Sequence, residues 1–288
     1  MDEMKRNLFV GLAAVALLAQ ACGTAPAART ITPTATVTPT STVTAQDSGK
    51  IAFYSTTGSD HFQIYVMNGD GSDQINLSDN KADEWAPAWS ADGQQIAFVS
   101  ERDGDSEICI MNADGSNQTC LTDNQAEDLA PAWSPDGQQI AFMSKRGPWW
   151  LFAGLEEVWS VIFGNFEIYV MNADGSDQTR LTNNQAFDGV PVWSPDGQQI
   201  GFDSRRPGDE ERGYTAIYVM KADGSDQIRL TTNMGISDYP TWSPDGQQIA
   251  FRRIIGGYYQ IYVMNADGSG QIRLTNDQVT YSHPVWSR

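Results

Sequence analysis

Short apolar segments separated by turn residues recur along the chain from residue 50 to its end. Each repeat contains an Ile-Ala-Phe segment, an Ile-Tyr-Val-Met segment, a short segment typified by Arg-Leu-Thr, and a segment ending in Trp-Ser. Asp-Gly pairs lie between these apolar runs, which predicts β-strands joined by tight turns. The middle segments are apolar at successive positions, as expected of strands that are covered on both faces.

The repeats number five. Met-Asn-Ala-Asp-Gly-Ser or a near copy begins at Met67, Met111, Met171, Met220 and Met264, and Trp-Ser occurs at Trp89, Trp133, Trp193, Trp242 and Trp286. Successive Trp-Ser pairs are 44, 60, 49 and 44 residues apart. Four strands in a repeat of this length are typical of a propeller blade, so the sequence predicts an all-β, five-bladed β-propeller of four-stranded blades.

The two ends of the repeat region complement each other. The region opens at residue 50 with an Ile-Ala-Phe strand that no Trp segment precedes, and it closes with a Trp segment at 283–288. Pairing of this C-terminal strand with the N-terminal blade would close the ring and leave no exposed edge. We therefore expect closure by that strand.

The first 49 residues have a different character. Lys5 and Arg6 precede an apolar run that ends at Cys22, which predicts a signal peptide over residues 1–21. The residues before Cys22 resemble a bacterial lipobox, which implies cleavage there and a lipid on Cys22. An ordinary secretory signal cut near Ala21 or Ala25 is the alternative. Residues 22–49 are rich in Thr and Pro and are expected to form an extended tether, so the propeller spans 50–288.

The net charge separates the same two regions. The chain of 288 residues has 18 Lys+Arg and 36 Asp+Glu, a formal charge of −18. Residues 1–49 contain three acids and three bases, so the propeller has 33 acids and 15 bases and carries all of this charge. Such a surface repels phosphate backbones, so we expect no nucleic-acid partner.

The repeat motifs identify a family resemblance. Trp-Ser-Pro-Asp-Gly-Gln-Gln-Ile-Ala-Phe and Ile-Tyr-Val-Met-Asn-Ala-Asp-Gly-Ser resemble the repeats of TolB-type propellers over residues 50–288. The resemblance implies a periplasmic or cell-surface protein that binds other proteins and is not an enzyme, although such blades also occur beside hydrolase domains. TolB itself has six blades behind a separate N-terminal domain, whereas this chain has five repeats behind a tether.

The two faces of the predicted propeller differ. The turns between first and second and between third and fourth strands are nearly identical in every repeat, and we call their side the turn face. The remaining loops, on the opposite loop face, differ in every repeat. Binding sites are usually formed by loops on a rigid scaffold, so we expect recognition at the loop face.

Acids cluster on the loop face just before the Trp segments. They could surround the mouth of the axial channel and attract a cation or a basic partner segment. Alternatively, each acid caps its own loop or pairs with Arg102, Arg146 or Arg206. The candidate channel-mouth acids are Asp83, Glu84, Asp128, Asp188 and Asp238.

The third repeat contains an aromatic insert at residues 147–164. Exposed apolar surface of this density is typical of an interaction site, but a lid folded over the channel is equally compatible with the sequence. The candidate docking residues are Trp149, Trp150, Phe152, Trp159 and Phe163.

Residue types for catalysis or metal binding are sparse. The two histidines, His61 and His283, fall short of the three or so ligands that a metal site needs, and no Gly-x-Ser-x-Gly elbow is present. The Asn-Ala-Asp-Gly-Ser turns lack the Glu and the helices of a calcium loop. We expect no catalytic residues, no metal and no cofactor.

The repeats also predict a disulfide bond. If the third and fourth strands form a hairpin, Tyr faces Arg in three blades, where a cation–π contact is expected, and Cys109 faces Cys120 in another. Cross-strand cysteines lie within bonding reach and export supplies an oxidising compartment, so we expect the Cys109–Cys120 bond.

These observations predict a monomeric, membrane-tethered scaffold outside the cytoplasm that binds an envelope or extracellular protein or peptide. A carbohydrate- or small-molecule-binding propeller, with lyase or hydrolase activity from channel carboxylates, is the alternative.

Overall fold

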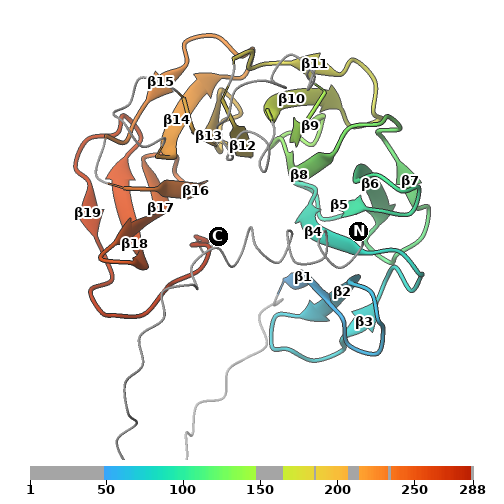
Figure 1. Cartoon of the computed structure of the whole chain (residues 1–288). Helices are drawn as coiled ribbons and strands as arrows, with labels where there is room; N and C mark the ends of the chain where they lie inside the picture. The colour runs from blue at the N-terminus through green and yellow to red at the C-terminus, as the bar shows by residue number, and fades with distance from the viewer. Residues whose placement is uncertain (1–48, 147–164, 185, 207–213, 233–234, 287–288) are drawn as a thin grey trace, which may run out of the picture. The chain divides into compact units, whose positions relative to one another are not determined.

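The structure is a computed structural model that describes residues 49–146, 165–184, 186–206, 214–232 and 235–286. These residues form five antiparallel β-sheets arranged in sequence order around a common centre (Figure 1). Successive blades pack through their inner strands, since β1 contacts β4, β5 contacts β8, β9 contacts β12, and β13 contacts β16. The five-bladed all-β propeller predicted from the repeats is therefore confirmed.

The first blade has three strands and the other four blades have four each. Blade 1 comprises β1 (Lys50–Ser55), β2 (Gln63–Asn68) and β3 (Ile75–Asn76). Blade 2 comprises β4 (Glu84–Trp89), β5 (Gln95–Ser100), β6 (Glu107–Asn112) and β7 (Thr119–Cys120). Blade 3 comprises β8 (Asp128–Trp133), β9 (Gln139–Ser144), β10 (Glu167–Asn172) and β11 (Thr179–Arg180). Blade 4 comprises β12 (Asp188–Trp193), β13 (Gln199–Ser204), β14 (Ala216–Lys221) and β15 (Ile228–Arg229), and blade 5 comprises β16 (Ser237–Trp242), β17 (Gln248–Ile255), β18 (Tyr258–Asn265) and β19 (Ile272–Arg273).

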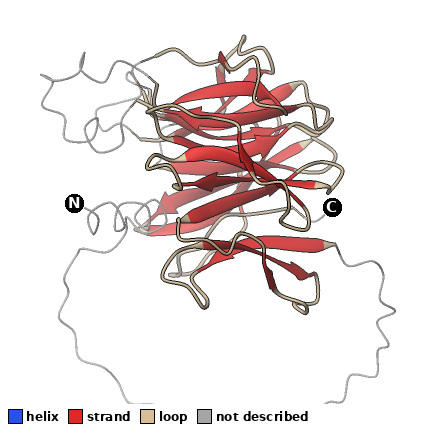
Figure 2. Ribbon diagram, turned by 90° about the vertical axis from the view of Figure 1, so that its right-hand side faces the viewer, coloured by secondary structure: helices blue, strands red, loops and turns tan. Residues whose placement is uncertain are grey.

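The strands run between two faces, with connecting loops on either side (Figure 2). In blades 2 to 5 the second strand carries a fully buried phenylalanine, and a tyrosine of the third strand packs on most of them, as Tyr169 does on Phe142 with ring centroids 5.7 Å apart. These rings form the core of the blades at Phe98, Phe142, Phe202 and Phe251. No helix long and apolar enough to cross a membrane occurs in the part of the chain that the structure describes.

Each inner strand of blades 2 to 5 contains a bulge. The register between the first and second strand shifts there, and the residue before the proline of the strand has a positive φ. These residues are Ala86, Ala130, Val190 and Tyr239. A positive φ is unfavourable for any residue except glycine, so the strain recurs at one place in each blade. In blade 5 the bulged residue with the positive φ is Tyr239, which lies between Asp238 and Thr241 where the register shifts.

The expected closure of the ring was wrong. Within the described residues β1 pairs only with β2, and no strand is assigned at 281–286. The C-terminal segment instead follows blade 5, where the Trp286 indole N–H donates to the Thr241 carbonyl at 3.2 Å. Trp193 makes the same contact with Ala132 between blades 3 and 4. The segment thus docks on blade 5 as an inner strand docks on the preceding blade. No strand pairing joins its described residues to β1, whose Ile51 and Tyr54 are 42% and 47% exposed.

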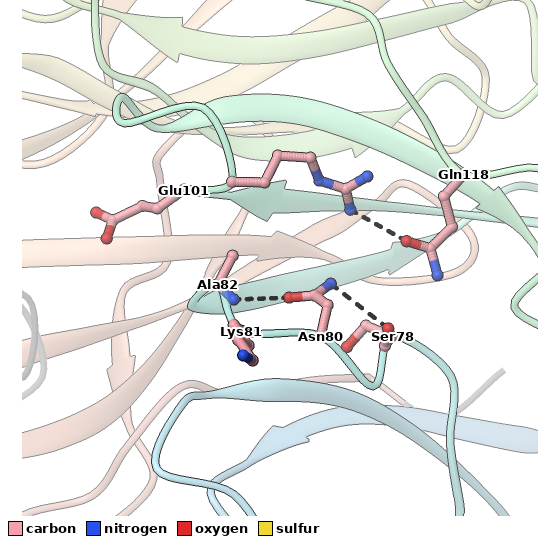
Figure 3. A pocket seen from close by; sticks show the side chains of 7 residues that line it. Ser78, Asn80, Lys81, Ala82, Glu101 and Gln118 are labelled. Carbon is pink, nitrogen blue, oxygen red and sulfur yellow. Dashed lines mark hydrogen bonds between the residues drawn. The ribbon is translucent and has the colours of Figure 1, made fainter.

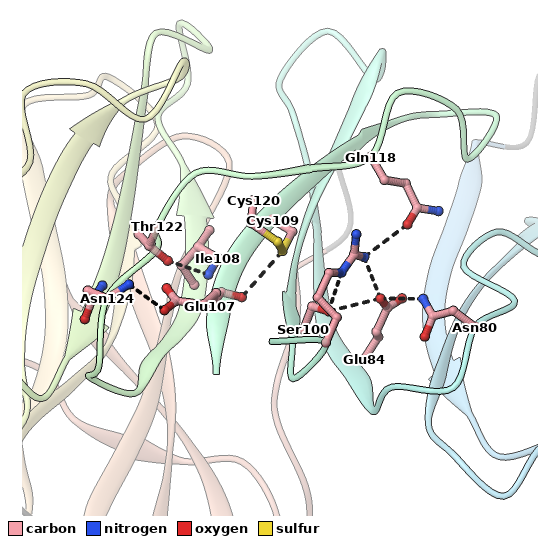
Figure 4. The surroundings of a disulfide bond; sticks show 11 residues. Asn80, Glu84, Ser100, Glu107, Ile108, Cys109, Gln118, Cys120, Thr122 and Asn124 are labelled. Carbon is pink, nitrogen blue, oxygen red and sulfur yellow. Dashed lines mark hydrogen bonds and ion pairs between the residues drawn. A yellow bond between two sulfur atoms is a disulfide. The ribbon is translucent and has the colours of Figure 1, made fainter. Parts of the chain in front are cut away.

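The predicted hairpin register is confirmed, together with the disulfide. Cys109 faces Cys120, and their sulfur atoms are bonded (Figure 4). Tyr169, Tyr218 and Tyr262 face Arg180, Arg229 and Arg273. The expected cation–π contact is wrong for Arg180, which turns away to bond Glu167 at 2.6 Å. The cations over these three rings are Arg146, Arg206 and Arg253, at 5.1, 4.7 and 5.0 Å from the ring centroids.

Candidate functional site

The turn face consists of self-contained turns. In each blade an Asp carboxylate accepts the backbone N–H of the Ser two residues later, as Asp114 does from Ser116 at 2.9 Å. Hydrogen bonds from Ser116 likewise lower the pKa of Asp114, so it stays ionised. Gly115 takes the positive φ that this turn needs, and a Cβ there would lie 2.8 Å from the Leu77 carbonyl of the preceding blade. These polar groups serve the fold, and they are the same in every blade.

On the loop face, three of the predicted channel-mouth acids are counter-ions inside their own blades. Glu84, Asp128 and Asp188 are fully buried. Each accepts a hydrogen bond from the Arg that follows the second strand, with distances of 2.7 Å from Arg102, 2.6 Å from Arg146 and 3.2 Å from Arg206. The structure therefore has the Arg pairing that was one of the two interpretations of these acids.

Each of these pairs belongs to a radial chain of hydrogen bonds. Arg102 also donates to Gln118 at 3.1 Å, and Gln118 donates to the Leu77 carbonyl of the preceding blade at 3.0 Å. On the other side of the pair, the Asn80 amide donates to Glu84 at 2.8 Å (Figure 4). Arg146 with Gln178 and Arg206 with Gln227 repeat the pattern. The network ties neighbouring blades together, so a structural role accounts for these residues.

A groove of about 410 Å³ lies beside this network, at the junction of blades 1 and 2 (Figure 3). Its lining side chains bond one another. The Asn80 side chain accepts from the Ala82 N–H at 2.7 Å, and Arg102 donates to Gln118. The groove is lined by Ser78, Asn80, Lys81, Ala82, Glu101, Arg102 and Gln118.

Asp83 and His61, two further sequence candidates, lie together in blade 1. The Asp83 carboxylate accepts the Phe62 backbone N–H at 2.8 Å and lies 3.5 Å from His61 Nδ1. Within the described ranges, no group of three or more His, Cys, Asp and Glu side chains could hold a metal ion. His283 lies apart, on blade 5.

Asp238, the last candidate acid, belongs to a different arrangement. The Arg252 guanidinium binds it through two hydrogen bonds, Nε to Oδ1 at 2.7 Å and Nη2 to Oδ2 at 2.9 Å. The Tyr239 and Tyr259 rings contact the same guanidinium, with centroids 4.3 and 4.0 Å from Cζ. His283 of the C-terminal segment packs on Tyr239 with ring centroids 3.8 Å apart. Arg252 and Asp238 are 5% and 7% exposed, so this is a buried, fully oriented ion pair.

Asp203 of the neighbouring blade completes this group. Burial raises its pKa well above the ordinary value, and the Asp238 charge adds to the effect. Burial also raises the pKa of Tyr239, and the Asp203 charge is the next cause. These mutual effects place the six side chains in one electrostatic environment. We call this set the rim cluster: Asp203, Asp238, Tyr239, Arg252, Tyr259 and His283.

Sequence reasoning missed most of the rim cluster. Val99, Met143, Asp203 and Arg252 occupy the same position of the second strand, the fifth of Gln-Ile-Ala-Phe-Val-Ser in β5. Comparison of the five repeats at that position would have shown the change from apolar to charged residues. The rim cluster gathers perturbed pKa values at the loop face, which is typical of a functional site.

Several sequence candidates lie outside the described residues. These are the lipidation candidate Cys22, the tether, and the insert at 147–164 with its docking candidates Trp149, Trp150, Phe152, Trp159 and Phe163.

Comparison with known families agrees with the repeat motifs. The family model of the TolB beta propeller domain matches residues 25–149 and 209–288, more than half of the chain. The chain belongs to the TolB beta-propeller family. Among curated relatives, this TolB-family chain is 39% identical over 46 residues to dipeptidyl-peptidase 5 of Porphyromonas gingivalis and 34% identical over 61 residues to the Tol-Pal system protein TolB of Blochmanniella pennsylvanica. The matches span 16% and 20% of this chain but only 7% and 14% of those relatives.

Solved structures share the fold of this TolB-family chain. TolB from Acinetobacter baumannii superposes with a TM-score of 0.63 and 23% identity, over 82% of this chain and 55% of that chain. Oligogalacturonate lyase in complex with manganese superposes with a TM-score of 0.60 and 14% identity, over 80% of this chain and 62% of that chain. The same architecture therefore serves proteins with different activities.

Proposed function

We propose that this TolB-family propeller is a non-enzymatic scaffold that binds another protein through its loop face. The observation that supports the proposal most strongly is the difference between the two faces. The turn face repeats one set of saturated turns, whereas the loop face carries the rim cluster and a different loop in every blade. A rigid frame that presents unlike loops on one side is suited to recognition.

The state of the loop-face acids favours binding over catalysis. Glu84, Asp128 and Asp188 are held by arginines, and Asp238 is held by Arg252. A carboxylate that already accepts hydrogen bonds from an arginine of its own blade is poorly placed to take a proton from a substrate, because general-base catalysis requires hydrogen-bond contact with that proton. The relation to the Tol-Pal system protein TolB supports a protein as the partner.

We further propose that the chain is exported and anchored by a lipid on Cys22, with residues 22–49 as the tether. A Cys22→Ser variant tests this placement by fractionation of cells that produce the full chain. We expect the parent chain in the membrane fraction and the variant in the soluble fraction. Equal amounts of both proteins in the membrane fraction would contradict the lipid anchor.

Cross-linking in intact producing cells tests the protein-binding function. Three full-length chains are compared: the parent, a variant lacking residues 148–163, and a turn-face control at two exposed side chains, Gln138→Arg with Gln198→Arg. Mass spectrometry of the cross-linked species should identify the same protein with the parent and the control, and less of it with the deletion. Equal recovery with the deletion would exclude the insert as the docking element, and absence of any cross-linked protein would contradict the scaffold function.

The purified chain is used to test the competing class of ligand, the carbohydrates. Because the fold is shared with oligogalacturonate lyase, the purified chain is also incubated with envelope glycans and with oligogalacturonate. Binding or cleavage of either saccharide would replace the protein-binding proposal.

A further inference from the structure

Asp203 is a buried carboxylate without a partner. It lies one residue before the end of β13, faces Gly189 in the register, and is 4% exposed. Its Oδ1 has no hydrogen-bond partner in the described part of the molecule. A buried acceptor left unpaired costs about 1–3 kcal/mol, and a buried unpaired charge costs more. Such a group persists at low cost only if something outside the described residues satisfies it.

The neighbouring groups leave Asp203 as the open position of the rim cluster. Arg252 directs two of its N–H groups at Asp238 and lies against two aromatic faces, so its charge is already matched by a carboxylate. Asp238 is neutralised by the same bonds. The Arg205 and Arg252 charges act on Asp203, but neither guanidinium donates a hydrogen bond to its Oδ1. The unmet need at the cluster is therefore for a hydrogen-bond donor at Asp203 Oδ1.

The equivalent positions in blades 2 and 3 hold apolar side chains, which require no hydrogen-bond partner. Val99 and Met143 occupy the place of Asp203, and both are buried apolar side chains. A carboxylate at this place is thus unnecessary for building a blade, and its presence in blade 4 requires another reason.

We propose that Asp203 binds a basic side chain, lysine or arginine, of the protein partner. This inference rests on the protein-binding function proposed above and specifies its chemistry. An ammonium or guanidinium group supplies the donors that Oδ1 lacks and forms a charge-assisted hydrogen bond with the ionised carboxylate. The Tyr239 and Tyr259 rings both lie on the Arg252 guanidinium, and the Asp203 charge acts on both phenols, so these two side chains belong to the surroundings of Asp203. The net charge of −18 draws a basic segment toward the domain.

The inference is tested with short peptides and the purified full chain. The probe is acetyl-Gly-Arg-Gly-amide, its lysine analogue is a second probe, and the citrulline peptide is the neutral control of equal size. The variants are Asp203→Asn, Asp203→Met, which copies blade 3, and Asp226→Asn, which removes an exposed acid paired with Lys221. Affinities come from calorimetry, and the Asp203 carboxyl carbon is followed by NMR.

We expect the parent chain and Asp226→Asn to bind the arginine peptide at least about tenfold more tightly than the citrulline peptide. Both Asp203 variants should bind the two peptides equally, and the carboxyl signal of the parent should move to its ionised position on binding. Charge-independent binding, an unchanged affinity in Asp203→Asn, or no saturable binding of either basic peptide would overturn the inference. If a cross-linked protein is recovered equally with Asp203→Asn, the scaffold function holds while this inference fails. If the basic peptides bind at Asp203 but no cross-linked protein is found, the inference on Asp203 holds while the scaffold function fails.

Discussion

Arg180 donates a hydrogen bond to the buried carboxylate of Glu167 across blade 3, at 2.6 Å. In blade 2 the same carboxylate is Glu107, but the residue at the place of Arg180 is Cys120. Glu107 is 4% exposed and its Oε1 accepts the Asn124 N–H at 2.9 Å, but no arginine donates to that oxygen as Arg180 does to Oε1 of Glu167. Oε2 has no partner within the described residues in either glutamate. Gain of the disulfide has thus left one carboxylate without its arginine.

We expect Glu107→Gln to stabilise the protein at neutral pH by about 1 kcal/mol. Burial raises the pKa of Glu107, so the folded state binds the proton more tightly than the unfolded chain. Ionisation therefore costs folding free energy above the ordinary Glu pKa of about 4.3, and none well below it. Gln is already present at this place in blades 1 and 5, as Gln63 and Gln260.

Chemical unfolding of both proteins between pH 3 and pH 8 checks this prediction, and the gain should shrink as the pH falls. Glu167→Gln is the matched control, and it should be less favourable because it deprives Arg180 of its counter-ion. A gain that does not vary with pH would contradict the assignment to Glu107 ionisation.

Blade 2 has the Cys109–Cys120 bond where blade 3 has Tyr169 and Arg180, and removal of the disulfide tests what that bond contributes to stability. Cys109→Ser with Cys120→Ser should lower the free energy of unfolding by about 3 kcal/mol, the loop-closure value for a sequence separation of 11. Cys109→Tyr with Cys120→Arg copies Tyr169 and Arg180 of blade 3 and gives Glu107 a guanidinium. It should recover part of the loss relative to the serine pair. Equal stability of the two double variants would show that the Tyr-Arg pair cannot replace the bond.

The radial ion pairs should contribute more than an exposed pair does. Asp128→Asn removes a fully buried counter-ion from Arg146, whose side chain is 22% exposed, and should cost about 2 kcal/mol. Asp226→Asn at the exposed pair with Lys221 should cost less than about 0.5 kcal/mol. Denaturant titration at one pH compares the two, and a larger loss from Asp226→Asn would refute the structural role of Asp128.

Docking of the C-terminal segment depends on Trp286. Trp286→Phe removes the hydrogen bond to the Thr241 carbonyl and should cost about 1 kcal/mol more than Trp133→Phe. The Trp133 indole N–H is buried without an acceptor in the described residues, so its loss carries no such cost. Both changes remove similar ring volume, so the difference between the two unfolding free energies isolates the hydrogen bond.

His283 should titrate far below the ordinary histidine range. The residue keeps exposed surface, but desolvation of its ring lowers the pKa to about 4, and the Arg252 charge acts in the same direction. Since the folded state binds this proton more weakly than the unfolded chain does, stability is lost as the pH falls from about 6.5 toward 4. NMR titration of the ring measures the midpoint, and His283→Asn should flatten this part of the stability profile. A midpoint near 6.5 would mean that His283 does not pack on Tyr239.

The sequence by itself determined the blades. Strand identity, the five-fold repeat, the hairpin register and the Cys109–Cys120 bond all follow from patterns within single repeats, where partners are close along the chain and turn chemistry sets their pairing. The acids before the Trp segments were also visible, together with the arginines that could neutralise them.

Only the tertiary structure decided which of these polar groups are paired. Arg180 could face Tyr169 or Glu167 in the same register, and side-chain packing selected Glu167. The rim cluster joins Asp203 of blade 4 to Asp238 and His283 of later segments, so it depends on how separate repeats pack against each other. Closure of the ring depends on the same long-range packing, because docking of Trp286 on blade 5 and pairing with β1 are separate contacts. Local patterns specify strands, whereas burial and charge between distant strands are set by the assembled fold.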